Sequence, residues 1–134
     1  MQIITDFKQV EHLVLPTPVL TMVYHHLLEP FEGYPEVADQ FWSDTGTQLL
    51  LLTNEDSDLS LKEQPFISDQ VLHHLQHTPE YVYQIGKGEQ AYLFALSVLD
   101  DEGRGCYFLS PIQSPTTLVK HLITQAQPFE TTCL

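Results

Sequence analysis

The alternation of apolar and polar residues is clearest in the second half of the chain, where it predicts three strands. Aromatic and β-branched residues dominate three segments separated by short glycine-containing turns, at residues 81–85, 90–99 and 104–109. Strands joined by such turns pair with one another, so we expect an antiparallel meander over residues 81–109. Leu96 lies in the middle of the longest strand and is expected to be central to the core.

A run of four consecutive leucines predicts one more strand, at residues 48–53. The run is too short for a helix of its own and has no polar side, so we expect it to be covered on both faces. Together with the meander it predicts a three- or four-stranded antiparallel sheet.

Apolar residues at helical spacing, with capping residues and prolines, predict four or five helices packed against this sheet. They are expected at residues 6–14 and 19–28, after Pro35, after Ser68 and after Ser114. Helices and strands do not alternate regularly, which argues against a parallel doubly wound sheet. The chain is therefore expected to have an α+β fold, with residues 1–134 forming a single globular domain.

Eighteen Asp and Glu residues face five Lys and Arg residues, which leaves a formal charge of −13 on 134 residues. Ten of the acids, but only one base, lie between residues 29 and 69. Hydrophobic residues make up 43% of the chain, so the charge belongs to a folded body rather than to a disordered acidic tail. Such a surface repels nucleic acid and anionic lipid and attracts basic proteins, so we expect no binding to nucleic acid or membranes.

No motif in the sequence identifies a reaction or a cofactor. The glycines at residues 86–88 and 103–105 lie in predicted β-turns, and neither group matches a phosphate-binding loop. A small acidic domain without a catalytic motif fits an inhibitor of a basic protein, of the immunity or nucleic-acid-mimic type. We therefore predict a small intracellular binding or inhibitory protein that engages a basic protein partner and carries no cofactor.

Acidic and aromatic residues are interleaved between residues 32 and 44, and this segment is the best candidate for a binding surface. Aromatic side chains anchor many interfaces, provided that they are exposed. The i,i+4 spacing of this segment also allows Phe41 and Trp42 to be core residues, and that alternative stays open. With the acidic loop at residues 54–58, the predicted partner-binding residues are Glu32, Tyr34, Glu36, Asp39, Trp42, Asp44, Glu55, Asp56 and Asp58.

The alternative hypothesis is a small ligand- or metal-binding module, or an enzyme, that uses the histidine clusters. On a helix, His73, His74 and His77 fall within one sector, and imidazoles at such spacing can bind Zn²⁺ or Cu²⁺. A solvated polar face and a pH-responsive patch explain the same cluster. In the second cluster, we expect His25 to form a surface ion pair with Glu29 and His26 to be buried and hydrogen-bonded.

Cys106 and Cys133 form no metal or redox motif and are expected to be reduced thiols. The N-terminus has no basic segment followed by a long apolar core, so we expect no signal peptide. The longest apolar stretch, at residues 13–28, is interrupted by prolines and histidines and is too short for a membrane span. These features predict a cytoplasmic location.

Overall fold

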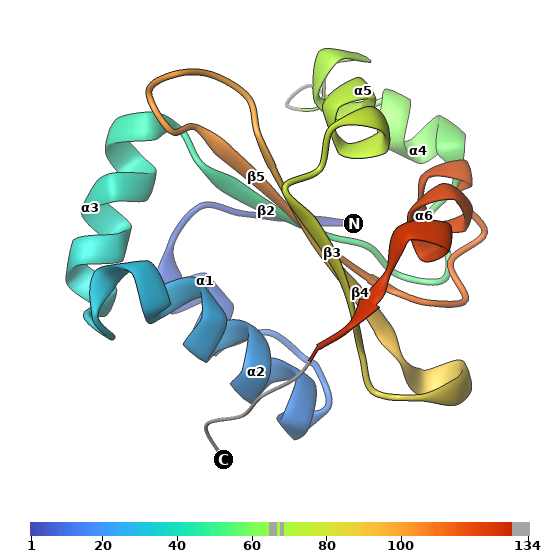
Figure 1. Cartoon of the computed structure of the whole chain (residues 1–134), viewed down its shortest axis with the longest axis horizontal. Coiled ribbons are helices and arrows are strands. Elements are labelled where there is room, and N and C mark those ends of the chain that lie inside the picture. The colour runs from blue at the N-terminus through green and yellow to red at the C-terminus, as the bar shows by residue number, and fades with distance from the viewer. Residues whose placement is uncertain (65–66, 68, 130–134) are drawn as a thin grey trace.

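The computed structural model describes residues 1–64, 67 and 69–129. Within these ranges, a six-stranded mixed sheet with the strand order β1-β2-β5-β4-β3-β6 runs through the centre of the molecule (Figure 1). The strands are β1 (Gln2–Ile4), β2 (Gln48–Leu51), β3 (Tyr81–Ile85), β4 (Tyr92–Val98), β5 (Gly105–Pro111) and β6 (Gln127–Pro128).

Helices cover both faces of the sheet, three on each side (Figure 1). On one face lie α1 (Phe7–Glu11), α2 (Thr17–Leu28) and α3 (Pro35–Thr45), and on the other lie α4 (Asp58–Lys62), α5 (Asp69–His77) and α6 (Thr117–Leu122). Short 3-10 helices follow α2, precede β4 and follow α6, as η1 (Glu29–Phe31), η2 (Gly88–Gln90) and η3 (Ile123–Gln125). None of the helices in the described ranges is long and apolar enough to cross a bilayer.

Each face of the sheet has its own hydrophobic core. The first core packs Phe7, Val23 and Trp42 from the helices against one side of the sheet. The second core packs Leu75 and Leu122 against the other side. Alternate residues of β2 and β5 enter the two cores, which explains the leucine run of β2: a strand between two helical layers has no polar side.

The sequence-based expectation of an α+β fold is confirmed, and so is the antiparallel meander of β3, β4 and β5. The expectation of an antiparallel sheet throughout is wrong, because β2 runs parallel to β5, with Leu50 opposite Phe108. No local turn joins these two strands. Two helices and the β3–β4 hairpin lie between them, so the local sequence does not determine their relative direction.

The sheet and the helical layers also contain more elements than the sequence predicts. β1, with three residues, and β6, with two, are too short to show a periodic pattern. α4 begins inside the segment expected to be an acidic loop, where Ser57 and Ser60 form a reciprocal capping box. The expected cap Ser68 lies outside the described residues, and the final helix is capped by Thr116 instead of Ser114.

α3 carries much of the predicted binding segment, and local sequence determines both of its ends. Pro35 occupies its first turn, where the missing N–H costs nothing. Gly46 ends it in the left-handed conformation and donates its N–H to the Trp42 carbonyl oxygen. Trp42 holds the helix on the sheet, with its ring centroid 5.1 Å from that of Phe7 and 5.6 Å from that of Tyr107.

Candidate functional site

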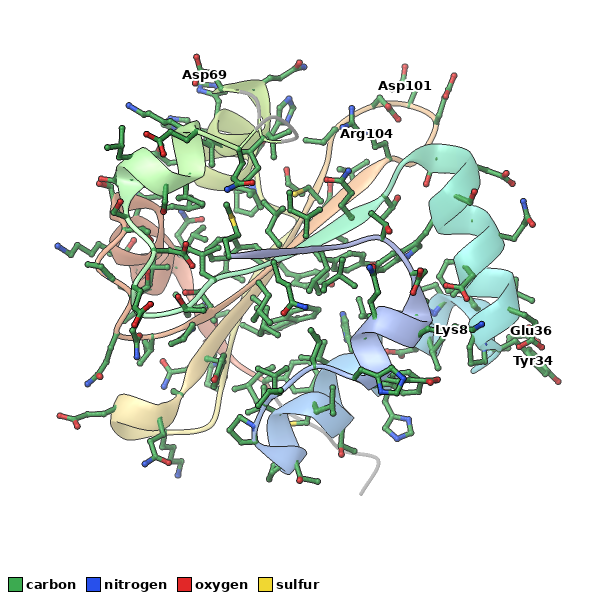
Figure 2. All side chains as sticks on the ribbon, turned by 180° about the vertical axis from the view of Figure 1, so that it is seen from behind. Lys8, Tyr34, Glu36, Asp69, Asp101 and Arg104 are labelled. Carbon is green, nitrogen blue, oxygen red and sulfur yellow. The ribbon has the colours of Figure 1, made fainter. Side chains whose placement is uncertain are left out.

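The outer side of α3 presents a row of exposed apolar side chains. Tyr34 is 54% exposed, Val37 50% and Phe41 39%. Their spacing of three and four residues places them one above another along the helix. Around this row the carboxylates of Glu32, Glu36 and Asp44 are exposed as well. Figure 2 shows Tyr34 and Glu36 pointing outward from the first turn of α3.

Glu32 reaches this surface through an unusual backbone conformation. It has a φ of 55° and is the one residue other than glycine with a positive φ in the part of the chain that the structure describes. A left-handed conformation costs an ordinary L-residue about 1–2 kcal/mol. Gly33 follows with a φ of 85°, so the two residues reverse the chain sharply between η1 and α3. This reversal places Tyr34 immediately before the helix.

The β4–β5 turn packs against Phe41, the last member of this row, although it is 62 residues away in sequence. Gly103 has a φ of 91°, and a Cβ atom at this position would lie 3.1 Å from Cζ of Phe41. The Phe41 ring also packs on Phe31, with a centroid distance of 5.4 Å. The turn itself is held by Asp100, whose Oδ1 accepts hydrogen bonds from two backbone N–H groups. Asp101 and Glu102, at its tip, are exposed, and Figure 2 shows Asp101 pointing outward.

We call this combined area the α3 surface. It consists of Glu32, Tyr34, Glu36, Val37, Phe41, Asp44, Asp101 and Glu102. The sequence analysis missed the last two residues, because only the tertiary fold brings the turn to α3. The sequence shows that the turn is acidic, but it does not show that the turn lies beside α3.

A polar groove of about 570 Å³ lies on the opposite flank of α3, between this helix, α1 and the start of β2. Asp39 contributes to it and accepts a 2.7 Å hydrogen bond from the backbone N–H of Phe7. Lys8 lines the same groove and lies beside the start of α3 in Figure 2. Asp39 is therefore half-buried and joins α3 to α1.

The second predicted acidic group lies far from the α3 surface. α3 comes before β2 in the chain, whereas these acids come after β2, in the connection to α4 and at the start of α4. Figures 1 and 2 both place α4 at the opposite end of the long axis from α3. Glu55 and Asp58 are exposed there, while Asp56 is only 6% exposed. The structure therefore divides the predicted binding residues between two separate places.

Asp56 is part of a local polar network. Its Oδ1 lies 3.2 Å from the α-ammonium group of Met1, and its Oδ2 accepts a 2.7 Å hydrogen bond from the N–H of Thr53. Burial acts to raise the pKa of Asp56, but the Thr53 hydrogen bonds and the Met1 ammonium group outweigh it and lower the pKa. Asp56 and the buried Trp42 are not available to contact a partner in this conformation.

Very little positive charge compensates the acids. Within the described ranges there are two ion pairs, Met1 with Asp56 and His26 with Glu29 at 3.9 Å. Neither involves a lysine or an arginine. The carboxylates of the α3 surface therefore project into solvent without a cationic partner from this part of the chain.

The fold rearranges the predicted histidine cluster. The rings of His73 and His77 lie side by side with centroids 4.4 Å apart, and His121 of α6 lies 6.2 Å from His77. His74 is instead 3.2 Å from the Thr78 hydroxyl through its Nδ1. In the described part of the chain, no three His, Cys, Asp or Glu residues are arranged as ligands for a metal ion.

The other histidine pair also differs from expectation. His25 is exposed, and it is His26 that approaches Glu29. The expected hydrogen bond of His26 is present, at 2.9 Å between its Nε2 and the Tyr81 hydroxyl. Burial lowers the pKa of His26, and the Glu29 carboxylate opposes this effect. Burial likewise raises the pKa of Tyr81 far above its usual value, so the phenol stays protonated.

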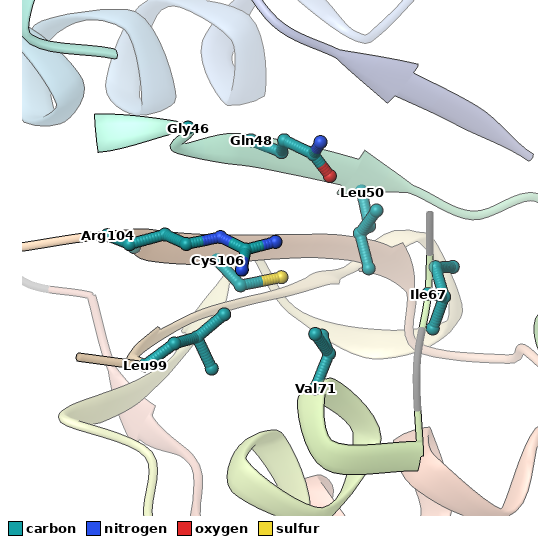
Figure 3. A pocket seen from close by; sticks show the side chains of 9 residues that line it. Gly46, Gln48, Leu50, Ile67, Val71, Leu99, Arg104 and Cys106 are labelled. Carbon is teal, nitrogen blue, oxygen red and sulfur yellow. The ribbon is translucent and has the colours of Figure 1, made fainter. Parts of the chain in front are cut away.

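Cys106 lines a small pocket between β2, β5 and α5 (Figure 3). The pocket has room for about 10 Å³, no more than one water molecule. The Arg104 side chain lies over the thiol in this view, but burial outweighs its charge and raises the pKa of Cys106 to about 12. The thiol is therefore protonated at neutral pH and is a poor nucleophile.

Comparisons of this chain with protein-family models, with curated proteins and with solved structures find no match.

Proposed function

We propose that this protein is a small acidic binding or inhibitory protein that engages a basic protein partner, in the cytoplasm. The observation that carries the proposal is the uncompensated negative charge: the chain has a formal charge of −13, and no described carboxylate pairs with a lysine or an arginine. Charge held at a protein surface without internal partners is available to attract an oppositely charged molecule.

The charge and the exposed apolar row have separate parts in this function. Long-range attraction speeds the encounter with a positively charged surface and disfavours acidic competitors. The apolar side chains of α3 then leave water in the complex, which slows dissociation. By covering a basic surface, the protein would block access of any anionic ligand to it, which is how inhibition of the immunity or nucleic-acid-mimic type would work.

The test is capture of the partner from a lysate of the source cells, with three versions of the immobilised chain. One is the unchanged protein. One carries Glu32→Asn, Glu36→Gln and Asp44→Asn, in which Asn at position 32 tolerates the left-handed backbone. The matched control carries Glu63→Gln, Glu80→Gln and Glu89→Gln, which remove the same charge from exposed positions elsewhere.

The proposal expects one basic protein that the unchanged chain and the control retain, that the α3 variant loses, and that salt elutes. Retained proteins that are not basic, or that stay bound at about 1 M salt, would contradict it, because surface electrostatics is screened over a few ångströms at that ionic strength.

A further inference from the structure

We propose that the partner segment lies along the α3 surface and reaches the β4–β5 turn, and that it presents an apolar side chain flanked by lysine or arginine residues. This inference rests on the proposed function and assigns it a place and a kind of partner. Three features of the described residues support it: the exposed apolar row, the acids on both sides of this row, and the directions of the nearest cationic side chains.

The apolar row differs from the other exposed apolar side chains of the molecule. Val14, Leu59 and Ile123 are exposed singly, on different elements. Tyr34, Val37 and Phe41 are exposed together on one helix. One more exposed apolar residue, Val98, lies close in sequence to the β4–β5 turn. It is 38% exposed, lies on the strand that leads into the β4–β5 turn, and by strand alternation shares the sheet face of Phe94, which α1–α3 cover.

The acids frame this row from two separate elements. Glu32, Glu36 and Asp44 stand along α3, and Asp101 and Glu102 stand on the turn at its C-terminal end. The eleven residues of α3 extend over about 16 Å, so these acids are spread along a strip and not gathered at one point. A partner segment of about three helical turns would match this length.

The nearest cations of the chain lie at the edges of this strip. Arg104 follows the turn directly, but its side chain lies along Gly46 and turns toward Cys106, on the α5 side of the sheet (Figure 3). Lys8 lines the groove on the opposite flank of α3. The strip itself therefore combines apolar side chains with negative charge alone, which complements a segment that is both basic and apolar.

The probe for this proposal is a fluorescein-labelled helical peptide of 15 residues with two leucines four positions apart and lysines on both sides of them. Its affinity is measured by fluorescence anisotropy at about 50 mM salt. Val37→Ser removes exposed apolar area at little cost in helix propensity and should weaken binding about tenfold. Asp101→Asn with Glu102→Gln should weaken it about fivefold.

Matched controls make the same chemical changes elsewhere on the molecule. Leu59→Ser replaces a side chain that is 65% exposed on α4, and Glu63→Gln with Glu89→Gln removes two charges from exposed positions outside the α3 surface. Both should leave the affinity within twofold. Amide chemical shifts on peptide addition should change along α3 and the turn and stay constant around α4.

The outcomes separate this inference from the proposed function. If the two charge pairs weaken binding equally, or if Val37→Ser has no effect, the placement on the α3 surface is overturned while attraction to a basic partner stands. If the unchanged protein does not bind the peptide at about 100 µM, the surface assignment fails. If binding occurs but does not weaken between about 50 and 300 mM salt, the proposed function fails as well.

Discussion

His26 is surrounded by four aromatic rings from three different parts of the chain. Its ring centroid lies 5.2 Å from that of Tyr81, 5.9 Å from Tyr83, and 5.5 Å from both Phe94 and Phe129. The imidazole thus joins α2 to β3, β4 and the residue that follows β6. The polar His26 side chain therefore occupies a core position, and its charge state affects how well these elements pack.

We predict that the stability of the protein decreases with falling pH because of His26. Burial lowers its pKa in the folded state from the usual 6.5, so the folded protein binds fewer protons at this position than the unfolded chain does. Its contribution is therefore complete above pH 6.5 and decreases as the pH falls through 6.5 toward the lower folded-state pKa. Denaturation of wild type and His26→Phe at about pH 7.5 and 5.5 tests this, since phenylalanine keeps a ring that does not titrate. Equal pH dependence in the two proteins would contradict the prediction.

On the face of β4 that carries Leu96, it is Phe94 that is completely buried. Its ring lies near those of His26, Tyr81 and Tyr107. Leu96 is only partly buried against the same core. The expectation that Leu96 is central is therefore wrong by two residues along the same strand face. We predict that Phe94→Ala costs about 3–5 kcal/mol of unfolding free energy, and Leu96→Ala less than about 2 kcal/mol. Urea denaturation compares the two, and the opposite order would refute the assignment.

In α4, the acidic residue Asp58 has a structural partner on another helix. The Asp58 carboxylate accepts hydrogen bonds from the backbone N–H of Thr117, at 2.7 Å, and from the Thr117 hydroxyl. The side-chain hydrogen bond from Thr117 is the main reason why the pKa of Asp58 is lowered. The contact joins the first turn of α4 to the first turn of α6, so this predicted binding residue connects two helices.

We predict that Asp58→Ala destabilises the fold by about 1 kcal/mol, the usual cost of losing a helix-terminal acceptor, and leaves partner association unchanged. Chemical denaturation and binding kinetics on the same variant provide the measurement, with Glu55→Gln as the matched control of charge alone. Unchanged stability together with slower association would place Asp58 in the binding surface instead.

At the scale of the whole molecule, two helical layers enclose the sheet and the acids remain outside. Local signals in the sequence were sufficient for the meander, whose turns and β-rich segments are contiguous, and for most helices, whose prolines and caps mark their ends. The direction of β2 against β5 was not predictable, because their pairing depends on the path of more than fifty intervening residues. The strands β1 and β6 are too short to show an alternation of apolar and polar residues.

The same distinction applies to the candidate site. The i,i+4 spacing did not distinguish Phe41 from Trp42, whereas the structure buries Trp42 with Ala38 and exposes Phe41 with Val37. The sequence did not show which distant parts of the chain lie close together in the fold. It did not show that the acidic β4–β5 turn lies beside Phe41, that Asp56 binds Met1, or that His121 approaches His77.

The central claim, that charge on the α3 surface recruits a basic protein, is tested most directly by association rate constants for the captured partner at about 50 and 300 mM salt. The proteins to compare are the unchanged chain, the α3 variant with Glu32→Asn, Glu36→Gln and Asp44→Asn, and the control with Glu63→Gln, Glu80→Gln and Glu89→Gln. We expect association of the unchanged chain and the control to slow with salt, and the α3 variant to associate more slowly at low salt with a weaker salt dependence. Association that does not depend on salt, or that is the same in the α3 variant and the control, would contradict the claim.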